Sequence, residues 1–519
     1  MPKPLKTLTT KKIILYFPNP LPYNRPWKGV PLSLLAISRI LDKKGYQVKI
    51  FSRFLQKNVE KEIIKHGQNS ICLGISAMTG FQIYDGLKIA KLFKKHFPKI
   101  PIVWGGWHVS ILPSESVKNK FVDMVIRGPA DESFPKLVFA LENKKNLATI
   151  KGLTFKKANK VHTNPDQPMP NLNKLPPLPY HLVDIKKCLI NTEYGKRTIS
   201  YISSYGCPHR CGFCVEQVVN KRRWSALNAT KVVKEWQHLY KKYKIDSIAI
   251  YDSNFFVDQN RVYRICQGLL TKKIRIKWGN ANGRIRQLSQ YKEKVWKLMK
   301  KTGCVMILTG AESGSQKALD FIKKDMDVKE IIKFTKLCKK YKIKILYSFL
   351  VGLPWSKKPT ENKKFVKQEY ATTLSLINKL LKICDRNRYT YYVFLPYPGA
   401  PLFKRAVKLG LKYPKNLKNW STYLMSPEDA FKITNKQKWI TSKQSRLTAM
   451  LTQYIFGLMD KDTYGLLQKR IPSKFYKFLF KITYKLALVP VKLRWKFKFF
   501  NFPLDYYLFT LIYKHAGLM

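Results

Sequence analysis

Short apolar strands alternate with amphipathic helical segments along most of this chain. The first cycle joins the apolar run 12–17 to a helical pattern that opens at Pro31 and ends at Gly45, and further cycles begin at 71–75 and 102–104. Such alternation predicts a doubly wound parallel sheet of the Rossmann type, whose ligands bind beyond the carboxyl ends of the strands. Five small or polar residues fall at those ends: Ser76, Thr79, Gly105, Gly106 and Gly128.

A proline-rich run, 165–179, interrupts the alternation. Because proline fixes φ and removes a backbone donor, this run predicts a linker between domains. Six further strand–helix units follow it and predict a partial (β/α)6 barrel of the TIM type, with its active site in the loops after the strands. We therefore expect an α/β protein with a Rossmann-like domain at 1–150, a hairpin and linker at 151–190, the barrel at 191–405, and a basic, aromatic helical region at 406–519.

Three of the nine cysteines lie close together after the first predicted barrel strand, at Cys207, Cys211 and Cys214. An iron–sulfur cube normally takes four cysteines, so three would leave one iron with an open coordination position. A structural zinc site is an alternative, but it needs four ligands and would have to recruit His209 or a distant residue. The thiols could also be packing or redox residues. The spacing favours the cluster.

The spacing C-x3-C-x2-C, with the aromatic Phe213 before the last cysteine, resembles the signature of the radical S-adenosylmethionine (SAM) family. The resemblance implies that the three cysteines hold a 4Fe-4S cluster and that its open iron binds SAM. An electron, supplied by a donor such as flavodoxin or ferredoxin, would then split SAM into methionine and a 5′-deoxyadenosyl radical. It further implies six SAM-binding residues: Phe213, Asp252, Arg284, Glu312, Ser313 and Pro354. The chain departs from the family pattern at Arg286, where an acidic residue is usual, and at Trp355 and Ser356, which replace glycine and glutamate.

The segment from Gly105 to Pro113, with 127–134, is similar to the cobalamin-binding domain that precedes many radical SAM barrels. The segment 396–403 also resembles the closing segment of the barrel in cobalamin-binding members. The motif D-x-H-x-x-G, which gives cobalt a histidine ligand in other cobalamin proteins, is missing. Cobalt would then have no histidine beneath it unless His108 serves. The resemblance implies seven cobalamin-binding residues: Ser76, Thr79, Gly105, Gly106, His108, Gly128 and Glu132.

Members that combine both parts most often methylate an unreactive carbon, so the resemblance implies a methyltransferase. In such enzymes SAM methylates reduced cobalt, the radical removes a substrate hydrogen, and the cobalamin delivers the methyl group. The sequence does not identify a residue that acts as general acid or base. The alternative within the superfamily is an oxidative cyclase or ring-rearranging enzyme. RNA methylthiolation is disfavoured, because that branch carries three further cysteines in its amino-terminal domain and this chain has only Cys72 there.

The chain carries a net charge of +67, from 98 Lys and Arg against 31 Asp and Glu. Such an excess suits nucleic acid or an anionic membrane as a partner. The positive charge, together with a structural zinc site at the three cysteines, gives a competing hypothesis: a non-catalytic, nucleic-acid-binding protein. However, the lysines are spread over every segment, which disfavours a nucleic-acid docking patch.

The other six cysteines are scattered singly, which argues against a disulfide framework. The first twenty residues contain only a five-residue apolar run, too short for a signal peptide, so we expect a cytoplasmic protein.

Near the carboxyl end, lysines recur every three or four residues from Lys474 to Lys485, opposite apolar residues such as Phe478 and Ile482. Such a helix could lie on the inner face of an anionic membrane, and the alternative is that it folds back onto the barrel. This apolar region also suggests a small-molecule or lipid-like substrate.

Overall fold

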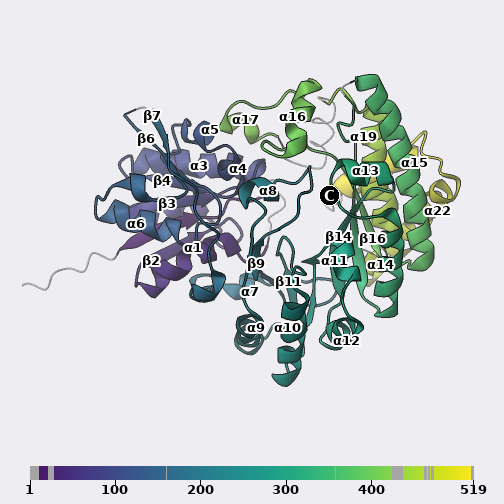
Figure 1. The fold of residues 1–519 in the computed structure, drawn as a ribbon, viewed down its shortest axis with the longest axis horizontal. Coiled ribbons are helices and arrows are strands. Elements are labelled where there is room, and N and C mark those ends of the chain that lie inside the picture. Colours follow the sequence, from purple (N-terminus) through teal and green to yellow (C-terminus); the bar gives the residue numbers. More distant parts are fainter. Residues whose placement is uncertain are drawn as a thin grey trace, which may run out of the picture.

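The computed structural model describes residues 11–21, 28–158, 160–356, 358–423, 437–460, 464–465, 468 and 473–515. A sheet domain lies beside a partial barrel, and α22 (Lys474–Phe497) lies on the side of the barrel that is away from the sheet domain (Figure 1).

The first domain is built on a seven-stranded sheet in the order β2-β1-β3-β4-β5-β6-β7. The strands are β1 (Lys12–Tyr16), β2 (Gln47–Phe51), β3 (Ser70–Ser76), β4 (Ile102–Gly105), β5 (Met124–Ile126), β6 (Leu153–Lys157) and β7 (Lys160–Thr163). The first five are parallel, as predicted, whereas β6 and β7 form an antiparallel hairpin that pairs with β5. The hairpin therefore extends the sheet and does not stand in the linker, where we expected it.

Alternating side chains of the strands supply two apolar cores, one on each face of the sheet. Ile13 and Leu15 belong to the core under α1 and α6, whereas Ile14 and Tyr16 belong to the core under α2 and α3. The helices of this domain are α1 (Leu32–Lys43), α2 (Val59–Gly67), α3 (Phe81–His96), α4 (Trp107–Ile111), α5 (Pro113–Val117) and α6 (Ser133–Glu142). Because helices cover both faces of the sheet, a ligand can reach the domain at the ends of the strands.

The linker contains one short α-helix and two short 3-10 turns, η2 (Leu172–Lys174), η3 (Tyr180–Leu182) and α7 (Ile185–Cys188). A further 3-10 turn, η1 (Leu147–Thr149), lies before the hairpin, between α6 and β6. The prolines between 165 and 179 account for the lack of longer elements.

The barrel consists of two parallel sheets in the orders β12-β11-β8 and β13-β14-β15-β16. Its strands are β8 (Thr198–Tyr201), β11 (Ser247–Ile250), β12 (Lys277–Gly279), β13 (Ala281–Asn282), β14 (Met306–Glu312), β15 (Lys344–Val351) and β16 (Arg388–Val393). Only Asn280, with a φ of 56°, separates β12 from β13. One interrupted strand thus joins both sheets, and the predicted partial (β/α)6 barrel is confirmed.

Helices follow each barrel strand and cover the outside of the barrel (Figure 1). They are α9 (Ala229–Tyr243), α10 (Gln259–Thr271), α11 (Ile285–Ser289), α12 (Glu293–Lys301), α13 (Gln316–Phe321), α14 (Val328–Lys340), α15 (Pro359–Ile383) and α16 (Pro401–Lys408).

The carboxyl-terminal region is helical, as predicted, and part of it covers the exposed edge of β16. Its elements are α17 (Leu417–Trp420), α19 (Ser442–Ala449), the π-helical turn η4 (Met450–Ile455), α20 (Phe456–Met459), α22 (Lys474–Phe497) and α23 (Leu504–His515). The Thr452 hydroxyl accepts a hydrogen bond from the Tyr391 amide (3.0 Å) and donates one to the Tyr391 carbonyl (2.7 Å). These bonds occupy polar groups of an edge strand. Residues 424–436, 461–463, 466–467, 469–472 and 516–519 of this region lie outside the described residues.

Candidate functional site

The three clustered cysteines lie on a loop at the carboxyl end of the first barrel strand, as predicted. The loop follows β9 (Ser204–Gly206), which pairs with β10 (Trp224–Ala226). The Gly212 amide donates to the Ile322 carbonyl (2.8 Å), and the Leu402 amide donates to the Gly212 carbonyl (3.0 Å). The loop is therefore tied at one point to segments near the fourth and sixth strands. All three thiols are free and partly exposed.

Polar and cationic side chains surround these thiols. Arg284 Nη1 lies 3.4 Å from Cys211 Sγ, and Asn254 Nδ2 lies 4.0 Å from Cys207 Sγ. Burial raises the pKa of the Cys214 thiol to about 12. Burial raises the pKa of the Cys207 thiol as well, so these two thiols keep their protons until a metal cation displaces them.

A buried ion pair lies beside the cysteine loop. Lys324 Nζ is 2.7 Å from Glu312 Oε1, and both side chains are buried. Burial opposes the charge on Lys324, but Glu312 and the nearby Cys211 thiol raise its pKa overall. Glu312 also has a φ of 61°, a left-handed conformation that is strained in residues other than glycine and is frequent at functional sites. Sequence reasoning predicted Arg284 and Glu312 but missed Lys324, whose only local signal was its place in a lysine-rich segment.

Asp252 has a different environment from the one we expected for a SAM-binding residue. Its carboxylate accepts hydrogen bonds from the Ser203 amide (2.6 Å), the Ser203 hydroxyl (2.7 Å) and the Ser204 hydroxyl (2.6 Å). The side chain is fully buried. Asp252 thus fixes the backbone just before the cysteine loop.

The remaining predicted SAM residues differ in their environments. Ser313 and Pro354 are buried at the ends of the fourth and fifth barrel strands, and Phe213 is partly buried against the apolar core. The Ser313 segment is tied to α15, because the Gly314 amide donates to the Thr373 hydroxyl (2.9 Å).

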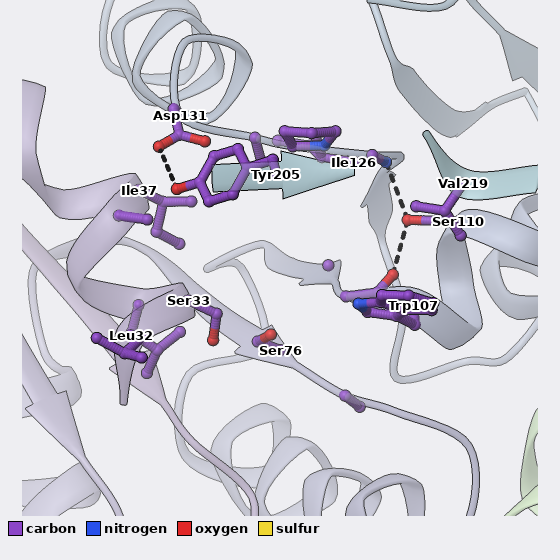
Figure 2. Close-up of a pocket in the computed structure, with 18 of the residues that line it drawn as sticks. Leu32, Ser33, Ile37, Ser76, Trp107, Ser110, Ile126, Asp131, Tyr205 and Val219 are labelled. Atoms are coloured by element: carbon purple, nitrogen blue, oxygen red, sulfur yellow. Dashed lines mark hydrogen bonds between the residues drawn. The ribbon is translucent and has the colours of Figure 1, made fainter. Parts of the chain in front are cut away.

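A cavity of about 330 Å³ lies at the carboxyl ends of the first sheet's strands, within the usual size range of small-molecule sites. Figure 2 shows Ser110 at its wall, where the hydroxyl accepts from the Gly128 amide (2.9 Å) and donates to the Gly106 carbonyl (2.7 Å). Barrel residues close the other side, among them Tyr205, Glu216, Asn220 and Ser253. The cavity therefore lies between the sheet and the cysteine loop.

The two glycines after β4 have different roles. A Cβ on Gly106 would lie 2.6 Å from the Ala77 carbonyl oxygen, and its φ is 97°, so this position requires glycine for backbone packing. At Gly105, which lines the cavity, the nearest atom to a Cβ is the Ile126 carbonyl oxygen at 4.0 Å. Gly105 thus leaves open space in the wall, as a flat ligand lying against the strand ends requires.

Four of the seven predicted cobalamin-binding residues line the cavity: Ser76, Gly105, Gly106 and Gly128. Thr79, His108 and Glu132 lie outside its lining. His108 is buried, with Nδ1 3.0 Å from the Thr79 hydroxyl and its ring 5.5 Å from that of Trp420. Burial lowers the pKa of His108 to about 3, so it stays neutral in this core. No histidine lines the cavity in the part of the chain that the structure describes.

A buried polar contact joins the two halves at this cavity. Arg39 of α1 forms an ion pair with Asp131. The Tyr205 hydroxyl donates to Asp131 Oδ1 (3.1 Å), as Figure 2 shows. Asp131 and Tyr205 line the cavity. Tyr205 lies two residues before Cys207, so this contact links the sheet domain directly to the cysteine loop.

The chain matches two protein families. The B12 binding domain family matches residues 24–138, and the Radical SAM superfamily matches residues 201–362. The chain is a cobalamin-binding radical SAM protein. It is accordingly an enzyme, and the match to the Radical SAM superfamily contradicts the competing hypothesis of a non-catalytic zinc protein.

Among its relatives, an uncharacterized methyltransferase of Pyrococcus horikoshii is 28% identical over 76% of this chain and 82% of its own length. An anaerobic magnesium-protoporphyrin IX monomethyl ester cyclase of Rubrivivax gelatinosus is 22% identical over 77% of this chain and 70% of its own.

Two solved structures share the fold. The cobalamin-dependent SAM radical enzyme OxsB, with aqua-cobalamin and SAM bound, covers 98% of this chain and 75% of its own, with a TM-score of 0.66 and 15% identity. The match to the methyltransferase TsrM of Kitasatospora setae, with cobalamin and a [4Fe-4S] cluster bound, covers 76% of this chain and 78% of TsrM, with a TM-score of 0.61 and 17% identity.

Among the described residues, no group of three or more His, Cys, Asp and Glu side chains is arranged to hold a single metal ion. A four-iron cube binds one cysteine at each corner and so spaces its ligands more widely than one ion does. The three thiols around one loop suit the cube.

A buried carboxyl group lies behind the barrel's strand ends and was missed by sequence reasoning. Glu369 of α15 is fully buried, and neither of its oxygens makes a well-formed hydrogen bond within the part of the chain that the structure describes. Burial raises its pKa to about 8, although the Gly352 amide and the Ser313 hydroxyl act in the opposite direction. Glu369 is therefore protonated at neutral pH, next to two strand ends that we predicted to contact SAM.

We expect Gly105→Leu to abolish cobalamin binding, because the larger side chain fills the open wall of the cavity. Gly105→Ala is the matched control and should still bind, since its Cβ meets no atom closer than 4.0 Å. Absorbance of cobalamin retained after gel filtration measures both. Equal retention by Gly105→Leu and the native protein would contradict this placement.

We expect Glu369→Gln to stabilise the protein increasingly as the pH rises. The native state keeps a proton on Glu369 that the unfolded chain loses above about pH 4.5, so the native protein loses stability until about pH 8. The difference in free energy of unfolding between variant and native protein should grow by ~1.4 kcal/mol per pH unit over that range. Denaturant unfolding measures it, with the exposed Glu361→Gln on the same helix as control. Parallel pH curves for Glu369→Gln and native protein would refute a raised pKa.

Proposed function

We propose that this enzyme transfers a methyl group from SAM to an unactivated carbon of a small-molecule or lipid-like substrate. The observation that carries the proposal is the position of the cavity. Its barrel-side wall includes Glu216 and Asn220, which follow Cys214 by two and six residues. A corrin bound against Gly105 would therefore face the segment that continues from the cysteine loop.

We assign the cluster to Cys207, Cys211 and Cys214. When bound, the cluster supplies the electron that cleaves SAM, and cobalamin supplies the methyl-carrying metal. Arg284 and Lys324 surround Cys211 with positive charge, which suits the carboxylate of SAM. Glu312 neutralises Lys324 and offers its second oxygen to the amino group of SAM.

The wall opposite the sheet presents polar groups to a substrate or to the corrin. The Glu216 carboxylate accepts hydrogen bonds from the Ser253 hydroxyl and from the side-chain amide of Asn220, which hold it at the cavity. These three residues are buried or partly buried, so they keep their orientation when water leaves the site.

Methyl transfer is favoured over oxidative cyclisation by the relatives. The Pyrococcus horikoshii protein, which is named a methyltransferase, is more similar to this chain than the Rubrivivax gelatinosus cyclase, at 28% against 22% identity over similar spans. A hopanoid C-3 methylase of Methylococcus capsulatus also matches over 67% of this chain, at 20% identity. Cyclisation or ring rearrangement stays the second candidate.

Two further features belong to the proposal. A one-electron donor such as flavodoxin or ferredoxin would reduce the cluster in the cytoplasm. The protein would also make peripheral contact with the inner face of the membrane. No helix among the residues with described coordinates is long and apolar enough to span a bilayer.

We expect anaerobically reconstituted protein to convert SAM to 5′-deoxyadenosine under reductant. Cells fed methyl-deuterated methionine should contain a deuterium-labelled metabolite that depends on the gene. Cys211→Ala should abolish both results, because it removes a cluster ligand. Cys384→Ala is the matched control, since Cys384 is also a partly exposed thiol but lies outside the loop.

Mass spectrometry of both reactions decides between the candidates. Cleavage of SAM with a gene-dependent product that carries no label would favour cyclisation or rearrangement. Cleavage that survives Cys211→Ala would contradict the cluster assignment.

A further inference from the structure

The outward face of α22 carries a continuous stripe of large apolar side chains. The exposed fraction of these residues ranges from 43% to 66%. They are spaced three or four positions apart, which places them on one side of the helix. The apolar stripe consists of Phe478, Ile482, Leu486, Val489, Leu493 and Phe497. A soluble surface rarely exposes so many large apolar residues in one line.

The opposite face of α22 already packs against α20, which in turn contacts barrel strand β16. Val491 and Trp495 are buried, and the Trp495 ring lies 5.5 Å from that of Phe456 in α20. The Tyr484 hydroxyl donates to the Leu458 carbonyl. The apolar stripe is therefore not needed to hold α22 on the protein.

Apolar exposure continues beyond the end of α22. Phe499 is 48% exposed, Phe502 82%, Leu504 81% and Leu508 61%. Phe499 and Phe502 lie in the turn after α22, and Leu504 and Leu508 lie in α23. Arg494 fixes the turn, because it pairs with Asp505 (2.6 Å) and donates to the Phe499 carbonyl (3.1 Å). The apolar surface thus spans two helices and the turn between them.

Positive charge flanks the apolar stripe. Lys481, Lys485, Lys492 and Lys496 are exposed, and each precedes a stripe residue by one position. The sequence from 473 to 515 has one acidic residue, Asp505, and Arg494 neutralises it. The exposed lysines of α22 therefore have no acidic residue of their own segment to balance them.

We propose that α22 and the following turn dock the enzyme on the surface of an anionic lipid bilayer. Helices that lie in a membrane interface combine an apolar face with a lysine-rich polar face, and lysine stems let the charges reach the headgroups. Nucleic acid would neutralise the lysines but leave the apolar stripe in water. A second copy of the chain would bring two rows of lysines together, which like-charge repulsion opposes.

The docking face lies on the side of the barrel away from the sheet domain (Figure 1). The cavity between the sheet and the barrel therefore does not take part in docking. Membrane binding and cofactor binding can be tested separately for this reason.

Flotation of the full-length holoprotein with vesicles tests the proposal. We expect it to float with phosphatidylglycerol–phosphatidylcholine vesicles and to stay at the bottom with pure phosphatidylcholine. Replacing Lys481, Lys485, Lys492 and Lys496 by Gln should weaken binding by about 1,000-fold, because each lysine near an anionic surface contributes ~1 kcal/mol. Phe478→Ser combined with Leu486→Ser should also lower the bound fraction strongly.

Matched controls change the same residue types elsewhere on the surface. The lysine control replaces four exposed lysines by Gln in or next to α9 and α10: Lys241, Lys242, Lys272 and Lys273. The apolar control combines Tyr84→Ser with Phe139→Ser. Both controls should leave vesicle binding unchanged. Cobalamin absorbance confirms that each variant is folded. Equal flotation of the lysine variant and its control would overturn the proposal. A dimer that Phe478→Ser with Leu486→Ser abolishes, without vesicle binding, would overturn it in favour of a second copy.

Discussion

The buried contact of Arg39, Asp131 and Tyr205 sets the relation between the two halves of the enzyme. Burying an ion pair costs desolvation, and removing one partner of such a pair typically costs ~3–5 kcal/mol because a charge is left uncompensated. The sheet domain supplies Arg39 and Asp131, and the barrel supplies Tyr205 just before the cysteine loop. A shift of the loop relative to the strand ends would break the Tyr205 hydrogen bond and open the buried ion pair to water. This bond therefore favours one mutual position of the cavity and the thiols.

Burial shapes the chemistry of the barrel's strand ends in the same way. Glu312 and Lys324 are buried as a charged pair, whereas Glu369 has no cationic partner among the described residues and keeps its proton. The strained backbone of Glu312 is held by its strand and by the ion pair. The buried charges and the strained backbone lie in the segments that we assign to SAM binding. Such features are typical of a site that is organised before its ligands bind.

The sequence allowed the parallel sheet, the partial barrel and the position of the cysteine loop to be predicted, because periodicity and local spacing determine them. It also identified four glycine or serine positions that line the cavity. It could not place Thr79 and His108 in a core with Trp420, since that contact joins positions about 310 residues apart. Lys324 and Glu369 were missed for the same reason: their burial depends on packing between distant segments. The hairpin was assigned to the linker because pairing with β5 leaves no local mark.

The central claim is that cobalamin in the sheet domain faces the cluster on the barrel loop. Electron paramagnetic resonance of the anaerobic holoprotein tests it most directly, with cobalt held as Co(II) and the cluster reduced. The account predicts that the two signals are broadened or split by spin–spin coupling, and that each recovers its isolated form when only one centre is loaded. Two independent, unbroadened signals in the fully loaded enzyme would contradict it.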